Sequence, residues 1–269
     1  MKENNNSLMP VLFIGHGTPM NAIEDNEFSR KWKGLGKTLP KPEAIVCVSA
    51  HWETEGSMAT AMDYPKTIHD FGGFPQELYT QQYPAPGSST LAETIKEQIK
   101  SFQIEKDYQW GLDHGAWCFL KHMYPEADIP VVELSIDYSK NMQYHYNLGK
   151  ELSFLRRMGI LVVGSGNMVH NLWLARPGKN GFNDSFSYDW AERLNRIMKE
   201  RILAGDHLSM VNYHSLSKDV ESGIPSQEHY IPLIYTLALQ EKGETVEIFN
   251  DKIVAGSLSM TSLIIGSYT

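Results

Sequence analysis

Short apolar runs alternate along this chain with segments of helical periodicity. The clearest runs predict buried strands at 11–14, 44–49, 129–136 and 160–163, and weaker ones predict strands at 57–62, 245–249 and 257–265. Between them, apolar residues recur every three or four positions and predict helices at 24–37, 88–102, 116–123, 142–158, 185–203, 206–213 and 227–241. This alternation predicts an α/β fold with helices on both faces of a central sheet. The two strands close together at the end predict a mixed, mostly parallel sheet.

The domain organisation is simple. The 269 residues suffice for one large α/β domain, and no repeat, low-complexity tract or linker divides them. We therefore expect a single domain over 10–269. One segment, 63–86, is rich in aromatic residues, glycine and proline without a clear period. Such a segment either packs over the sheet edge or covers a ligand.

Composition narrows the function classes. The formal net charge of −8 offers no basic surface for nucleic acid. No apolar run is long enough to cross a membrane, and the polar N-terminus lacks a signal peptide's apolar core, so we expect a cytoplasmic protein. Cys47 and Cys118 fall in predicted elements and are expected to be buried thiols. With no CxxC motif, a bound metal would need imidazole and carboxylate ligands, which favours zinc or non-haem iron.

Three predicted strands each lead to a histidine. His16 follows the first strand, His51 the second, and His170 follows the strand at 160–163 after a Gly-Ser-Gly-Asn turn. Open α/β sheets bind ligands at the carboxyl ends of their strands, so we expect these imidazoles to meet in a pocket there. A single histidine in this position is more often structural, but three histidines at the ends of three strands argue against a chance placement. Glu53 either orients His51 or is a surface carboxylate.

Two further histidines stand out. His229 is predicted in the first turn of the helix at 227–241, where the helix dipole favours the neutral, metal-binding imidazole. A water-facing histidine is the alternative, and Glu228 beside it is a competing ligand. His114 either donates a hydrogen bond to a substrate or caps the helix that Asp113 precedes. The remaining histidines are expected to be structural or solvated: His69, His122, His145, His207 and His214.

These histidines lie in five motifs: Gly15-His16-Gly17-Thr-Pro19, Ser49-Ala-His51-Trp-Glu53, Asp113-His114-Gly115, Gly166-Asn-Met-Val-His170-Asn and Glu228-His229-Tyr230. In this order and spacing, from about residue 10 to 265, they resemble the class III extradiol ring-cleavage dioxygenases, in particular the 4,5-DOPA extradiol dioxygenase branch. The resemblance implies a single catalytic α/β domain with a non-haem metal in a pocket at the carboxyl ends of the strands.

The same resemblance implies roles for the histidines. His16, His51 and His229 become metal ligands. His170 becomes the acid/base group beside the metal, close enough to act as a fourth ligand when zinc is bound, and His114 orients the substrate or assists proton transfer. In the protocatechuate branch the third ligand is a glutamate, whereas the matching position here is His229. Three imidazoles suit zinc as well as iron.

The implied activity is a ring-opening dioxygenase that adds O₂ to a small, DOPA-like aromatic diol. It would use one divalent metal ion per chain, Fe²⁺ for activity or Zn²⁺ as a bound ion. His170 would take a proton from the catechol and return it later, and the aromatic loop at 71–74 could close over the ring. The alternatives are a zinc-dependent hydrolase-type enzyme on the same scaffold and a non-catalytic binding protein. The physiological catechol and the oligomeric state stay open.

Overall fold

The protein is described here by a computed structural model of residues 8–179 and 181–268. Within them, the main sheet consists of β1 (Val11–Gly15), β2 (Ala44–Thr54), β3 (Ser57–Thr60), β4 (Ile104–Asp107), β5 (Val131–Asp137), β6 (Ile160–Gly166), β7 (Val246–Phe249) and β10 (Ser262–Ile265). A separate pair is formed by β8 (Ile253–Val254) and β9 (Leu258–Ser259). The helices are η1 (Pro19–Ala22), α1 (Glu27–Thr38), α2 (Gln76–Tyr79), α3 (Ser89–Gln98), α4 (His114–Met123), α5 (Met142–Glu151), α6 (Phe154–Arg157), α7 (Asp189–Leu203), α8 (His207–Val211), η2 (Tyr213–Ser215), α9 (Val220–Gly223) and α10 (Ile231–Ala238).

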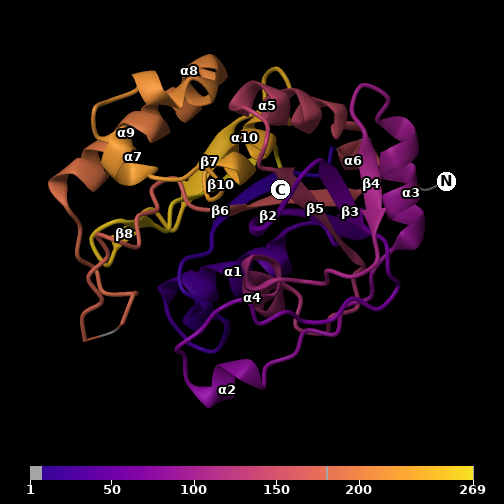
Figure 1. Ribbon diagram of the computed structural model, residues 1–269, viewed down its shortest axis with the longest axis horizontal. Coiled ribbons are helices and arrows are strands. Elements are labelled where there is room, and N and C mark those ends of the chain that lie inside the picture. The colour runs from indigo at the N-terminus through magenta and orange to yellow at the C-terminus, as the bar shows by residue number, and fades with distance from the viewer. Residues whose placement is uncertain (1–7, 180, 269) are drawn as a thin grey trace.

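The strands of the main sheet lie in the order β4-β3-β5-β2-β6-β1-β10-β7. The four central strands, β5, β2, β6 and β1, are parallel, and antiparallel pairs join them to the flanking strands on both sides. Helices cover both faces of this sheet (Figure 1). The predicted single-domain α/β fold with a mostly parallel, mixed sheet is confirmed.

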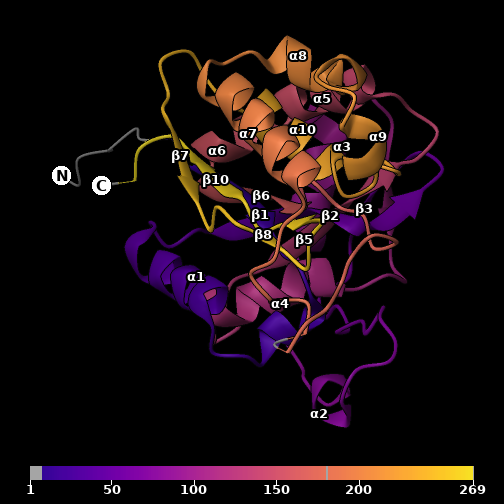
Figure 2. The same cartoon turned by 90° about the vertical axis from the view of Figure 1, so that its left-hand side faces the viewer.

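Alternate residues of the central strands enter two different cores. In β1, Val11 and Phe13 join the core under α10, whereas Leu12 and Ile14 join the core against α1 and α4. The two helical layers stand on opposite sides of the sheet in Figure 2, with α5, α7 and α10 on one side and α1 and α4 on the other. Because both faces are covered, these strands read as continuous apolar runs instead of alternating ones.

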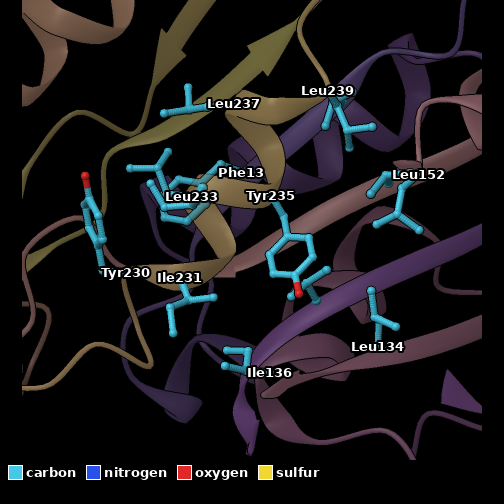
Figure 3. Close-up of a cluster of buried hydrophobic side chains, with 14 of the residues drawn as sticks. Phe13, Leu134, Ile136, Leu152, Tyr230, Ile231, Leu233, Tyr235, Leu237 and Leu239 are labelled. Atoms are coloured by element: carbon cyan, nitrogen blue, oxygen red, sulfur yellow. The ribbon is translucent and has the colours of Figure 1, made fainter. Parts of the chain in front are cut away.

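The larger core surrounds α10. Leu233 and Tyr235 of this helix lie among Phe13, Leu134 and Ile136 of the sheet (Figure 3). All eight residues of α10 are buried, and a helix that is apolar all round belongs in the interior. This packing fixes the start of α10 against the carboxyl ends of the central strands.

Several predicted boundaries are wrong. β2 continues to Thr54 because its pairing with β5 shifts register between Val48 and Glu53 and then resumes. His51 therefore lies inside β2, at this irregularity, and not beyond the strand. The helix predicted at 227–241 begins only at Ile231, so His229 lies in the preceding turn.

Other differences concern element lengths. The helix predicted at 142–158 is broken into α5 and α6, the strand predicted at 257–265 is broken into β9 and β10, and several helices begin a few residues later than predicted. The short edge strand β4 and the small helix α2 were not predicted. Cys47 and Cys118 are buried free thiols, as expected. None of the helices in the described ranges combines the length and apolar character needed to span a bilayer.

Candidate metal centre

Five histidines meet at the carboxyl ends of the central strands. His16 follows β1, His51 lies in the last part of β2, His170 follows the turn after β6, His114 begins α4, and His229 precedes α10. All five line one cleft with a volume of about 370 Å³. The structure thus brings together every histidine that the sequence singled out. The other five histidines do not line this cleft: His69, His122, His145, His207 and His214.

Three of these imidazoles present nitrogens to one another. His16, His51 and His229 each offer one ligand atom within 4.8 Å of the other two. The shortest separation joins the Nε2 atoms of His16 and His51, at 3.1 Å. Two imidazole nitrogens that share one zinc ion, each about 2.0–2.1 Å from it, lie at about this separation from each other. The donor set fits a single metal ion.

Polar contacts behind two of the rings assign their tautomers. The Ser165 hydroxyl donates to the Gly115 carbonyl, so it accepts from His16 Nδ1–H at 3.0 Å. His51 Nδ1 lies 3.3 Å from the Asp70 carboxylate, which accepts only, so this nitrogen also carries its proton. Both Nε2 atoms then direct lone pairs at each other across 3.1 Å. This arrangement is repulsive without a cation and is typical of imidazoles oriented for a metal.

His229 is oriented in the same way. Its Nδ1 donates to Glu228 Oε1 at 3.0 Å, which leaves Nε2 to act as the ligand atom. Burial acts to raise the pKa of Glu228, but the hydrogen bond and charge of His229, together with hydrogen bonds from a backbone N–H and from Ser226, outweigh it and lower that pKa to about 2. The competing ligand candidate Glu228 therefore stands behind His229 as its hydrogen-bond acceptor.

Two further groups of possible metal ligands overlap this set: His51, Asp70 and His114, and His170, Glu228 and His229. In each group the carboxylate already accepts a hydrogen bond from an imidazole nitrogen of the same group. A carboxylate placed so orients the imidazole in front of it. The three-histidine set is the one whose facing nitrogens lack protons.

Burial keeps these histidines neutral. It lowers the pKa of His16, His51 and His170 well below 6.5, and the neighbouring histidines lower it further. Burial also lowers the pKa of His229, against the opposing effect of Glu228. The neutral imidazole is the form that binds a metal ion or accepts a proton.

Asp70, which the sequence did not single out, connects two of the histidines. Its Oδ2 accepts from His114 Nδ1 at 2.8 Å and lies 3.3 Å from His51 Nδ1, while its Oδ1 accepts from the His114 backbone N–H at 2.9 Å. Burial acts to raise the pKa of Asp70, but the hydrogen bonds from His114 outweigh it and lower that pKa. The suggestion that Glu53 orients His51 is wrong, since Asp70 occupies that position and Glu53 is exposed.

His170 stands beside the proposed ligands. Its ring stacks on His229 with centroids 3.5 Å apart and planes 6° from parallel. It is not part of the three-histidine group, although it lines the same cleft. Among the described residues, no group is hydrogen-bonded to its imidazole, so its ring nitrogens are available to a bound molecule.

The aromatic segment at 63–86 both packs and lines the cleft. Leu78 and Tyr83 are buried in the core against α4, and the Tyr83 hydroxyl donates to the Tyr124 carbonyl at 3.1 Å. Phe71 and Phe74 line the cleft, and the Phe71 ring meets the His114 ring edge-on at 5.5 Å. Both interpretations of this segment therefore hold for different parts of it.

The first turn of α4 fits tightly against β2. A Cβ on Gly115 would lie 2.5 Å from Ser49 Oγ and 2.9 Å from His51 Cδ2, so only glycine permits this approach. Asp113 precedes the helix as predicted, but its carboxylate makes no capping bond. It accepts instead from the Ser49 hydroxyl at 2.6 Å. Gly115 and Ser49 thus pack directly against His51.

Comparisons with known proteins agree with this geometry. Residues 10–258 match the family model of the catalytic LigB subunit of aromatic ring-opening dioxygenase. The chain is 47% identical over 265 residues to a 4,5-DOPA dioxygenase extradiol of Escherichia coli K12, covering 96% of this chain and 95% of that protein. A Beta vulgaris protein of the same name is 33% identical over 262 residues, covering 95% and 96%. The crystal structure of the uncharacterized protein JW3007 from Escherichia coli K12 has a TM-score of 0.82 at 42% identity, covering 96% of this chain and all of that one.

Proposed function

Because the chain belongs to the family of catalytic LigB subunits of aromatic ring-opening dioxygenases, we propose that residues 10–269 act as one catalytic domain that opens small catechols, DOPA among them, with ferrous iron. Family membership makes the protein an extradiol dioxygenase that uses O₂, an aromatic substrate and a non-haem metal. The names of the curated relatives support a DOPA-like diol as one substrate.

The proposed metal ligands are His16, His51 and His229. The observation that carries this assignment is the 3.1 Å separation of two Nε2 atoms whose rings carry their protons on the opposite nitrogens. When bound, a divalent non-haem iron supplies the redox chemistry that joins O₂ to an aromatic ring. Zinc suits the same three imidazoles, so we expect it to bind and to compete.

The chain's own residues would then handle protons and orientation. His170 is neutral because burial lowers its pKa, and it faces the cleft, so it can accept a proton from a catechol hydroxyl. Asp70 holds the Nδ1 proton of His114, which leaves Nε2 of that ring to accept a hydrogen bond from substrate. Phe71 offers an apolar surface to a flat aromatic ring.

Anaerobic reconstitution of the metal-free protein tests this function. We expect O₂ uptake and a yellow product with catechol or DOPA in the iron form and none in the zinc form. His16→Ala should abolish metal binding, whereas His170→Ala should keep the metal and lose turnover by about 10²–10⁴-fold. His214→Ala, an exposed histidine outside the cleft, is the matched control and should behave as wild type.

Two outcomes would contradict the proposal. An iron-loaded protein that takes up no O₂ with any catechol would refute ring opening. Hydrolytic activity of the zinc form without O₂ would favour the zinc enzyme instead.

A further inference from the structure

A cluster of amide and carboxylate side chains ties two segments of the cleft wall together. One segment follows His16 and the other contains Phe182, and both line the cleft. Asn183 donates through its Nδ2 atom to Asn21 Oδ1 and to Glu24 Oε2, both at 2.8 Å. These acceptors lie 162 and 159 residues away along the chain. The cluster therefore joins parts of the wall that are remote in sequence.

The partners fix the orientation of the Asn183 amide. A carboxylate oxygen only accepts, so Glu24 requires the NH₂ group of Asn183 on its side. Asn21 uses its own NH₂ group to donate to the His16 carbonyl at 3.0 Å, which turns its Oδ1 toward Asn183. Asn21 is fully buried, and Asn26 donates to the same Oδ1 at 2.8 Å. Asn21 is thus held in place by bonds other than the one from Asn183.

The segment that contains Phe182 is otherwise anchored at its two ends. Backbone hydrogen bonds join Arg176 and Asp184 to Ala255, at 2.8 and 2.9 Å. Of the described residues between Arg176 and Asp184, Asn183 alone hydrogen-bonds to another segment of the chain. Its side chain therefore holds the neighbouring Phe182 in the wall of the cleft.

We propose that Phe182 forms part of the binding surface for the catechol ring and that Asn183 is the residue that positions it. This inference rests on the proposed dioxygenase function and adds two residues to its substrate site. Phe182 lines the same cleft as Phe71, and its ring packs against the core on the α4 side of the sheet. An aromatic side chain that is already ordered binds a flat ring more tightly than one that must be ordered on binding.

Asn183→Leu tests this positioning role, because leucine is similar in size and removes both hydrogen bonds. Binding of catechol and of DOPA to the zinc-loaded protein, measured by calorimetry, should weaken about 5–20-fold. In the iron-loaded protein KM should rise by a similar factor with kcat within about twofold of wild type, since Phe182 would contact substrate and transition state alike. The affinity for zinc should also stay within about twofold, because Asn21 still holds the His16 carbonyl.

A double-mutant cycle separates positioning from a merely structural role. Phe182→Ala should weaken the binding of both catechols at least as much as Asn183→Leu does. If Asn183 acts through Phe182, adding Asn183→Leu to Phe182→Ala should cause no further loss of affinity. Ser185→Ala changes an exposed residue of the same segment and is the control, which should bind both catechols as wild type does.

The outcomes separate this inference from the function on which it rests. Wild-type affinity of Asn183→Leu for both catechols would overturn it, even if the variant unfolded at a lower temperature, because the bonds would then be structural only. Losses that add in the double variant would overturn it as well. Failure of the iron-loaded protein to open any catechol would instead refute the dioxygenase function, and the Kd values of the zinc form would still decide whether Asn183 positions Phe182 for a catechol ring.

Discussion

Replacement of Asp70 by asparagine tests how the proposed metal ligand His51 is oriented. In the native site Oδ2 faces two Nδ1–H donors, those of His114 at 2.8 Å and His51 at 3.3 Å, while Oδ1 accepts from a backbone N–H. In Asp70→Asn the remaining carbonyl oxygen can keep the backbone bond. The amide NH₂ then faces the two imidazole donors, and His51 loses the acceptor that fixes its tautomer.

The size of this effect follows from the geometry. Loss of a hydrogen-bond partner behind a metal-bound histidine reduces metal affinity by about 10–100-fold, which corresponds to about 1.4–2.7 kcal/mol. The contact between His51 Nδ1 and Asp70 Oδ2, at 3.3 Å, is longer than an ordinary hydrogen bond, so we expect the lower half of this range, about 10–30-fold. Glu228→Gln should produce a loss of the same kind at His229, whose bond is 3.0 Å.

Competition with a chromogenic chelator, for Zn²⁺ in air and for Fe²⁺ without oxygen, measures the affinity directly. Glu77→Gln removes a carboxylate from α2, in the same irregular segment, and serves as the control. It should leave the affinity unchanged. If Asp70→Asn bound both metals within about twofold of wild type, the Asp70 carboxylate would not orient His51 or fix its tautomer.

Three further predictions concern stability and packing. Gly115→Ala should lower metal affinity and reduce the free energy of unfolding in urea by about 1–3 kcal/mol, because the added Cβ meets Ser49 and His51. Gly34→Ala in α1 is the control: a Cβ there meets nothing within 4 Å, so it should increase the free energy of unfolding by about 0.5–1 kcal/mol. Burial lowers the pKa of His145 to about 4 from 6.5, so the unfolded chain binds more protons and stability falls as pH drops from 6.5 toward 4. At about pH 5 this loss is about 2 kcal/mol, and His145→Leu should abolish that part of the slope in the metal-free protein; an unchanged slope would refute it. Arg156→Met should cost about 3–5 kcal/mol by leaving Glu244 and two backbone carbonyls without their buried partner. Its metal affinity should match wild type, since Arg156 precedes β6 and lies at the far end of that strand from the cleft.

The sequence predicted the fold well where burial dominates. Central strands such as β1 and β6 are apolar on both faces, and this pattern is independent of distant partners. Prediction failed where tertiary contacts decide the boundaries. β2 is extended by pairing with β5 beyond a register shift, and α10 begins after a turn that the apolar periodicity of 227–241 does not reveal.

The residues of the candidate site were likewise predicted only in part. The five histidines were found because each stands in a short motif beside a strand or helix end. Asp70 and Ser165 were missed because their partners, His51 and His16, lie on other elements. Neither residue has a spacing to its histidine that a sequence pattern could show. Asp113 precedes α4 as predicted, but its side chain accepts a hydrogen bond from the Ser49 hydroxyl instead of capping the helix.

The position of the carboxylates has a chemical consequence. Asp70 Oδ2 lies 3.3 Å behind the His51 ring and Glu228 accepts a hydrogen bond from His229, so both carboxylates stand outside the proposed set of metal ligands. There they would increase the basicity of these histidines, and the three proposed ligands would themselves be neutral. A metal held by three neutral ligands attracts anionic oxygens more strongly than one whose charge is reduced by a coordinated carboxylate. Because a catechol must lose protons to bind through both oxygens, this arrangement favours binding of the deprotonated diol. His170, neutral and stacked on the proposed ligand His229, would then receive the proton in the function proposed above.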